Sequence, residues 1–123
     1  MPETLLLTAG RHTATITCYD TPTAQAICAA LPIQSEVHTW GQEIYFGVPV
    51  EATLETDARD VVEAGEIAFW VEGRCIAVGF GPTPISRGDE IRLAAAVNVW
   101  GHADDVHGFA ACTPGDPVMV RRA

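Results

Sequence analysis

Short runs of β-forming residues, broken every few positions by glycine or proline, constrain the fold of this chain more than any other feature. In Thr13–Tyr19, small or apolar residues alternate with threonines, and this period of two is typical of a strand with one buried face. A second run, Thr4–Thr8, is separated from it by Ala9–Arg11, in which Gly10 can adopt a turn conformation. The two runs therefore predict a hairpin.

The same alternation continues along the chain and predicts an all-β, antiparallel protein. Residues Glu36–Val50 alternate around a tight break at Trp40–Gln42. The two prolines of Phe80–Pro84 exclude regular ladder hydrogen bonding in that segment, which is expected to be a loop. Further strands are predicted at Ile67–Val71, Cys75–Phe80, Ala95–Trp100 and Val118–Arg122.

One segment has the start and stop signals of a helix. Asp20–Thr23 offers an N-cap followed by a proline that suits the first turn, and Pro32 ends the segment. We expect one main helix at about residues 22–31. The polar segment Asp57–Glu63 predicts a short helical turn at most.

Length and charge limit the organisation of the chain and its partners. The 123 residues, 48% of them hydrophobic, predict a single domain over residues 1–123 with its own core. There are seven arginines, no lysine and a net charge of −9, so nucleic acid and anionic membranes are not expected as partners. No apolar run reaches the ~18–20 residues that span a bilayer, and the start of the chain lacks the basic region of a signal peptide. A cytoplasmic location is expected.

The metal-binding and redox residue types are not arranged as a site. The four cysteines contain no CxxC pair and are expected to be reduced thiols that pack as small hydrophobic residues. The segment His102–His107 has suitable side chains, but their spacing matches no standard ligand pattern. Neither a metal nor another cofactor is expected. The four cysteines are Cys18, Cys28, Cys75 and Cys112.

Four segments, read in order, resemble a small prokaryotic family of stand-alone cyclophilin-like proteins whose biochemical role is unsettled. The combination of a TWGxEIYF element with a following FGxTP element carries the resemblance, which extends from about Leu5 to Val120. The resemblance implies a closed, eight-stranded antiparallel barrel, with the helix capping one end. The segments are His38–Phe46 (HTWGQEIYF), Val61–Trp70 (VVEAGEIAFW), Phe80–Ser86 (FGPTPIS) and Ala96–Gly101 (AVNVWG).

The resemblance raises the question of peptidyl-prolyl isomerase activity. Rotation about the amide bond has a barrier of ~18–20 kcal/mol, and cyclophilin isomerases lower it with an arginine aimed at the prolyl amide above an aromatic-lined pocket. Their FHR-type and QGGDFT-type motifs are not found, and no arginine neighbours a Phe-His pair. Fold likeness alone does not carry an activity. We therefore expect no catalytic residues.

The candidate ligand-binding residues are aromatic and polar side chains at strand ends. Trp40, Glu43 and Tyr45 either line a surface groove or belong to a packed turn and a solvated face. Adjacent strand residues point to opposite faces, so one of Phe69 and Trp70 is expected to face outward. Asn98 lies in an apolar run and either braces the Gly81–Pro84 loop or presents its amide to a ligand. The predicted groove comprises Trp40, Glu43, Tyr45, Phe69, Phe80, Thr83 and Asn98.

These observations predict a barrel that binds a small molecule or peptide segment in a surface groove without catalysis. One alternative is weak peptidyl-prolyl isomerisation. Another is an accessory subunit of an amide- or carboxylate-processing assembly, since cyclophilin-like barrels recur in oxoprolinase- and allophanate-type systems. A structural adaptor, which could be a homodimer, would require an exposed sheet edge or apolar patch.

Overall fold

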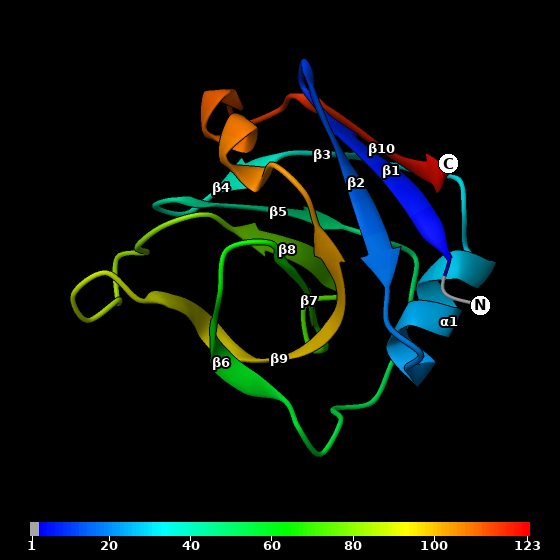
Figure 1. Ribbon diagram of the computed structural model, residues 1–123, viewed down its shortest axis with the longest axis horizontal. Coiled ribbons are helices and arrows are strands. Elements are labelled where there is room, and N and C mark those ends of the chain that lie inside the picture. Colours follow the sequence, from blue (N-terminus) through cyan, green and yellow to red (C-terminus); the bar gives the residue numbers. More distant parts are fainter. Residues whose placement is uncertain (1–2) are drawn as a thin grey trace.

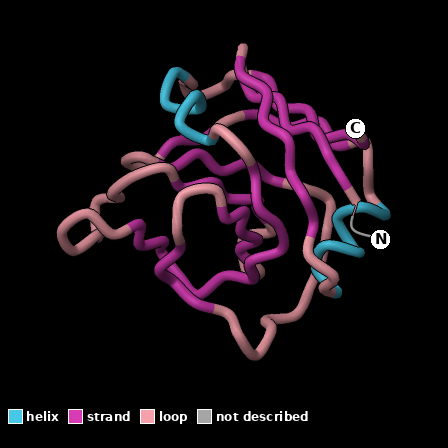
Figure 2. Tube along the Cα trace, in the orientation of Figure 1, coloured by secondary structure: helices cyan, strands magenta, loops and turns pink. Residues whose placement is uncertain are grey.

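Ten antiparallel strands are the main regular elements of the protein in the computed structural model, which describes residues 3–123 (Figure 1). One α-helix and one 3₁₀ helix lie at the periphery of the strands (Figure 2). The strands are β1 (Thr4–Ala9), β2 (His12–Cys18), β3 (Ile33–Glu36), β4 (His38–Thr39), β5 (Glu43–Gly47), β6 (Arg59–Val62), β7 (Glu66–Trp70), β8 (Cys75–Gly79), β9 (Ile91–Ala103) and β10 (Pro117–Arg122). The helices are α1 (Pro22–Ala29) and η1 (Val106–Ala111).

Nine of the strands follow one path, β3-β10-β1-β2-β9-β7-β8-β5-β4, and form a nearly closed barrel. The two ends of this path, β3 and β4, are separated in the sequence by Val37 alone. The backbone N–H of Val37 donates to the Asp116 carbonyl, and its own carbonyl accepts from Gly115 N–H, both at 2.9 Å. When β3 and β4 are counted as one bent strand, the barrel has the eight strands that the sequence predicts.

Alternation along the strands fills the barrel interior. In β1 and β2, the inward positions include Leu5, Leu7 and Ile16, all with no exposed area. The alternate positions, which are mostly threonines, face outward. Because the pairing of the two strands is regular, each inward residue is opposite another inward residue. The predicted N-terminal hairpin is confirmed, with Gly10 at φ +60° in its turn.

Helix α1 packs one side into this core. Thr21 caps it by accepting a hydrogen bond from the Ala24 N–H, at 3.1 Å, and Pro22 occupies its first turn. Ala24 and Ile27 are buried against the strands. The helix ends at Ala29, slightly earlier than predicted. Within residues 3–123, no helix has the length and apolar character needed to cross a membrane.

A second, smaller core lies on the outer face of the barrel wall. The long strand β9 contributes to both cores, because its first half pairs with β6 and its second half pairs with β2 and β7. The segment Asp57–Glu63, predicted as a short helical turn, instead contains the strand β6, because its backbone pairs with β9 and Val62 is buried there. The fully buried members of this core are Val62, Ala68, Ala77, Ile91, Leu93 and Val97.

Candidate functional site

The outer face of β5 and β8 forms the floor of the candidate site. Because strand side chains alternate, β5 directs Ile44 and Phe46 into the barrel and Glu43 and Tyr45 to the opposite face. In the register of the sheet, Tyr45 is opposite Ala77 of β8. The small side chain of Ala77 leaves room above the sheet beside the tyrosine ring.

The first half of β9 crosses over this face and leaves a pocket beneath it. The pocket has a volume of about 340 Å³ and walls that are mainly aliphatic and aromatic. We call it the Glu43 pocket, because Glu43 is the only acidic side chain in its lining. Its lining residues are Trp40, Glu43, Tyr45, Trp70, Cys75, Ala77, Leu93, Ala94, Ala95 and Val97.

A glycine lets β9 approach the floor closely at one end of the pocket. Gly79 of β8 is opposite Glu43 in the register. A Cβ atom added at Gly79 would lie 2.4 Å from Cγ2 of Ile91, so no side chain fits between the two strands there. The roof strand is thereby held against the floor at Gly79 and leaves space farther along, over Ala77.

The Trp70 ring forms one wall of the pocket and is positioned by packing. It lies over Gly73 in the turn between β7 and β8, where an added Cβ would be 2.2 Å from ring atoms Cε3 and Cζ3. The indole Nε1–H is buried without a hydrogen-bond partner among residues 3–123. The position of this wall therefore depends on the absence of a side chain at residue 73.

Replacing Gly73 with alanine is expected to displace the Trp70 ring and destabilise the protein by about 1–3 kcal/mol, the usual cost of overpacking. The backbone of Gly73 is outside the left-handed region, so the clash with the ring is the cause of the effect. The measurement is the indole N–H resonance of Trp70 in a ¹H–¹⁵N NMR spectrum, together with urea unfolding. Gly47→Ala is the matched control, because a Cβ there meets nothing within 4 Å. Equal, small effects of the two substitutions would contradict this account of the wall.

The Glu43 side chain is largely buried and lines the pocket, and its carboxyl group has no protein partner among the described residues. Glu43 is only 6% exposed. Among the described residues, its carboxylate makes no hydrogen bond or ion pair, whereas Glu66 and Glu90 are each paired with an arginine. Burial raises the pKa of Glu43 from its ordinary value of 4.5 to about 7. The carboxyl group can therefore gain or lose a proton near neutral pH.

The thiol of Cys75, which also lines the pocket, has a raised pKa. Burial raises the pKa of Cys75, and the negative charge of Glu43 raises it further. Cys75 is consequently a protonated, weakly polar part of the wall and a poor nucleophile.

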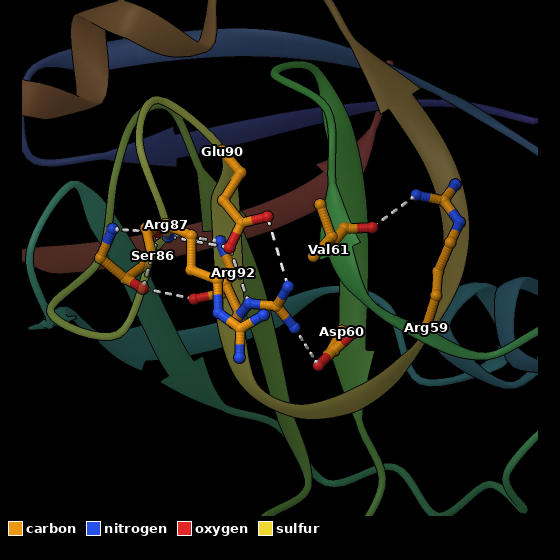
Figure 3. A network of polar contacts seen from close by, with 8 residues as sticks. Arg59, Asp60, Val61, Ser86, Arg87, Glu90 and Arg92 are labelled. Atoms are coloured by element: carbon orange, nitrogen blue, oxygen red, sulfur yellow. Dashed lines mark hydrogen bonds and ion pairs between the residues drawn. The ribbon is translucent and has the colours of Figure 1, made fainter.

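Arg92, which directly precedes the roof residue Leu93 in the chain, is paired with acidic side chains outside the pocket. Arg92 donates from Nη1 to Asp60 Oδ2 and from Nε to Glu90 Oε1, both at 2.7 Å (Figure 3). The loop before β9 is fixed through Ser86 Oγ, which accepts from the Arg92 N–H at 3.1 Å (Figure 3). None of the arginines lines the Glu43 pocket.

Three of the seven residues predicted to line a groove come together in the pocket: Trp40, Glu43 and Tyr45. Trp70, rather than Phe69, is the member of its pair on the pocket face. Phe69 has no exposed area and belongs to the barrel core, because its position in β7 points inward. Its inclusion in the groove is therefore corrected.

The other three predicted residues do not line the Glu43 pocket. Phe80 packs against the barrel core and borders a second cavity on the other side of Glu43. Thr83 is buried, and its hydroxyl donates to the Arg92 carbonyl and contacts Ser86, which ties the loop to β9. Asn98 has a bracing role, but toward α1 and residues 53–55 instead of the Gly81–Pro84 loop.

The remaining floor and roof residues of the pocket were not predicted from the sequence: Cys75 and Ala77 on the floor, and Leu93, Ala94, Ala95 and Val97 on the roof. The available signal for Ala77 is the alternation of β8, since it shares a face with Gly79 and Cys75. The roof has no local signal, because Ala94 and Ala95 line the pocket only through the crossing of β9 over the sheet.

The nearly closed barrel, its helix and the second core over the outer face are those of a cyclophilin-like protein. The chain belongs to the cyclophilin-like family, whose model matches residues 3–121. It is similar to the solution structure of a hypothetical protein from Archaeoglobus fulgidus, with 38% sequence identity and a TM-score of 0.85. The match covers 99% of this chain and 95% of that one. Comparison with the curated proteins found no match.

Proposed function

We propose that the protein binds a small organic molecule in the Glu43 pocket and does not transform it chemically. The observation that carries the proposal is the side chain of Glu43, which is only 6% exposed, lines the pocket and makes no hydrogen bond or ion pair with the described residues. Burying an unpaired ionisable group costs stability, and such groups concentrate at binding and catalytic sites. A ligand that contacts Glu43 would provide the missing partner.

The rest of the pocket supports binding of a molecule of modest size. Its volume of about 340 Å³ lies at the lower end of the ~300–1,000 Å³ typical of ligand pockets. Three half-buried aromatic side chains, Trp40, Tyr45 and Trp70, offer a large contact area at little entropic cost. This combination of apolar walls and one buried polar group is the usual composition of a small-molecule site.

The pocket gives less support to prolyl isomerisation. That reaction would require an arginine directed at the prolyl amide, and the pocket lining contains none. The arginines closest in sequence to the pocket residues are Arg74, which pairs with Glu51, and Arg92, which pairs with Asp60 and Glu90. Neither of the remaining polar side chains of the lining, Cys75 and Tyr45, is a cation that could replace an arginine.

A bulky residue placed in the pocket is expected to abolish binding. Ala95 is half-buried and lines the pocket. Ala95→Phe should therefore lower the affinity for pocket ligands by about tenfold or more, because the ring occupies the ligand's space. Ala96 is exposed and does not line the pocket, so Ala96→Phe is the matched control. Binding is measured by NMR titration of the labelled protein with small amines, alcohols, amides and carboxylates and with short proline-containing peptides.

The expected result is saturable binding of at least one compound class to the wild type and to Ala96→Phe, with loss in Ala95→Phe. The proposal fails if no compound binds, or if the two variants bind equally well. Tight binding of the proline peptides with accelerated cis–trans exchange would favour the isomerase alternative instead.

A further inference from the structure

We infer that the ligand class of the Glu43 pocket is a small organic cation, an ammonium group attached to an apolar body. This inference rests on the proposed function and names its ligand. It is drawn from three features of the pocket: its single unpaired carboxyl group, the lack of any basic side chain in its lining, and its three aromatic side chains.

The charges around Glu43 leave it free to pair with a cation. The titratable groups in the lining besides Glu43 are Tyr45 on the same strand and Cys75 on β8, and β7 and β9 contribute none. Behind Tyr45, the ring of His38 on β4 stacks on the tyrosine with centroids 5.2 Å apart. On its other side, Glu43 borders a second cavity that includes Cys112. None of these groups forms an ion pair with Glu43.

The aromatic walls suit the same ligand. An ammonium group within about 6 Å of a tryptophan or tyrosine ring centroid is attracted to the ring face, and the attraction is stronger when the pair is removed from water. Trp40, Tyr45 and Trp70 come from three different segments, namely the β4–β5 turn, β5 and β7, and line one pocket with Glu43. A cation held there would contact aromatic rings and the carboxylate together.

Anionic and neutral ligands fit the Glu43 pocket less well than a cation does. An anion would be repelled by the ionised Glu43 carboxylate, with no basic side chain in the lining to compensate. A neutral molecule would leave the ionised carboxylate without a counter-charge. A cation gives the ionised Glu43 carboxylate a counter-charge that the lining does not supply.

Proton uptake by Glu43 makes the inference distinguishable from general hydrophobic binding. A cation pairs with the ionised carboxylate, so a proton on Glu43 competes with it. With the pKa of Glu43 near 7, the affinity for a cation should rise about tenfold for each pH unit up to about 7 and then level off. A ligand that accepts a hydrogen bond from protonated Glu43 would show the opposite dependence.

The test compares three probes with one ring and different charges: benzylammonium, benzyl alcohol and benzoate. Binding of each to the full chain is followed by NMR titration at several values between about pH 5 and about pH 8. The variants are Glu43→Gln, which keeps the shape but removes the charge, and His38→Gln, which removes the imidazole ring that stacks on Tyr45. Ala95→Phe reports whether binding occurs in the pocket.

We expect benzylammonium to bind most tightly at about pH 8 and to weaken toward pH 5. Glu43→Gln should reduce its affinity about 10- to 100-fold and remove the pH dependence, as expected for loss of a charged hydrogen bond. His38→Gln should keep both the affinity for benzylammonium and its pH dependence. A pH dependence that survives in Glu43→Gln and disappears in His38→Gln would overturn the assignment to Glu43.

The remaining outcomes separate this inference from the proposed function. If benzyl alcohol or benzoate binds as tightly as benzylammonium at about pH 8, and Ala95→Phe abolishes that binding, the ligand class is wrong while the pocket is still a binding site. If no probe binds and the broader compound set also fails, the inference and the proposed function fall together.

Discussion

Replacement of Glu43 by glutamine is expected to stabilise the protein above neutral pH by up to about 3 kcal/mol. The pKa of Glu43 is raised from 4.5 to about 7 in the folded protein, because burial disfavours the charged form. The folded state therefore holds a proton between pH 4.5 and 7 that the unfolded state has released. Each pH unit between the folded and unfolded pKa values of Glu43 corresponds to about 1.4 kcal/mol of stability. The contribution of Glu43 to the free energy of unfolding therefore falls as pH rises through this window.

The measurement is urea unfolding of wild type and Glu43→Gln at intervals between about pH 4 and about pH 8. The two unfolding free energies should be similar near pH 4 and diverge as pH rises, with the variant the more stable above pH 7. Glu72→Gln is the control for removing one negative charge from an acidic protein, because Glu72 is exposed in the β7–β8 turn. If wild type and Glu43→Gln keep a constant difference across the range, the carboxyl group of Glu43 is not held in a destabilised ionised form.

Asn98→Ala is expected to cost about 3 kcal/mol of stability. Asn98 has no exposed area. Its Nδ2 donates to Thr23 Oγ1 at 3.0 Å and to the Thr53 carbonyl at 2.8 Å, and its Oδ1 accepts from the Glu55 N–H at 2.8 Å. Alanine would leave these partners without their bonds and open a cavity, and each unsatisfied buried polar group costs about 1–3 kcal/mol.

The comparison variant for this prediction is Thr23→Val. It keeps the shape of the side chain but removes one acceptor of Asn98 and the hydroxyl that donates to Glu55 Oε2. The two backbone contacts of Asn98 remain, and the expected cost is about 2 kcal/mol. Both values are obtained from urea unfolding at one pH. A smaller loss for Asn98→Ala than for Thr23→Val would show that the amide does not brace α1 and residues 53–55 as described.

Local sequence patterns were sufficient for the strands that pair with their neighbours in the chain. The hairpins around Gly10 and Trp40–Gln42 join adjacent runs of alternating residues, so their signals are contained within a few positions. The strand β6 was missed because its partner, β9, lies about thirty residues later. A polar segment such as Asp57–Glu63 does not indicate that another strand will pair with it.

The residues of the candidate site also divide into those that local alternation predicts and those that depend on long-range contacts. Glu43 and Tyr45 were identified because alternation within one strand places them together on the face opposite Ile44 and Phe46. The choice between Phe69 and Trp70 remained open, because alternation shows that they face opposite sides but not which side is the core. The partners of Asn98 come from α1 and the segment before β6, and such long-range contacts leave no trace in local spacing.

The position of β10 has a consequence for how the chain folds. β10 lies between β1 and β3 in the barrel, and Leu5 of β1 is paired with Arg122 of β10 (Figure 1). The second edge of β1 is therefore paired only when β10, more than a hundred residues later in the chain, is in place. Folding rates fall as contacts connect more distant parts of a chain, because loop closure must precede the pairing. During synthesis on the ribosome, the barrel cannot close before this final strand has emerged, and the earlier strands depend until then on the β1–β2 hairpin and the β5–β8–β7 sheet.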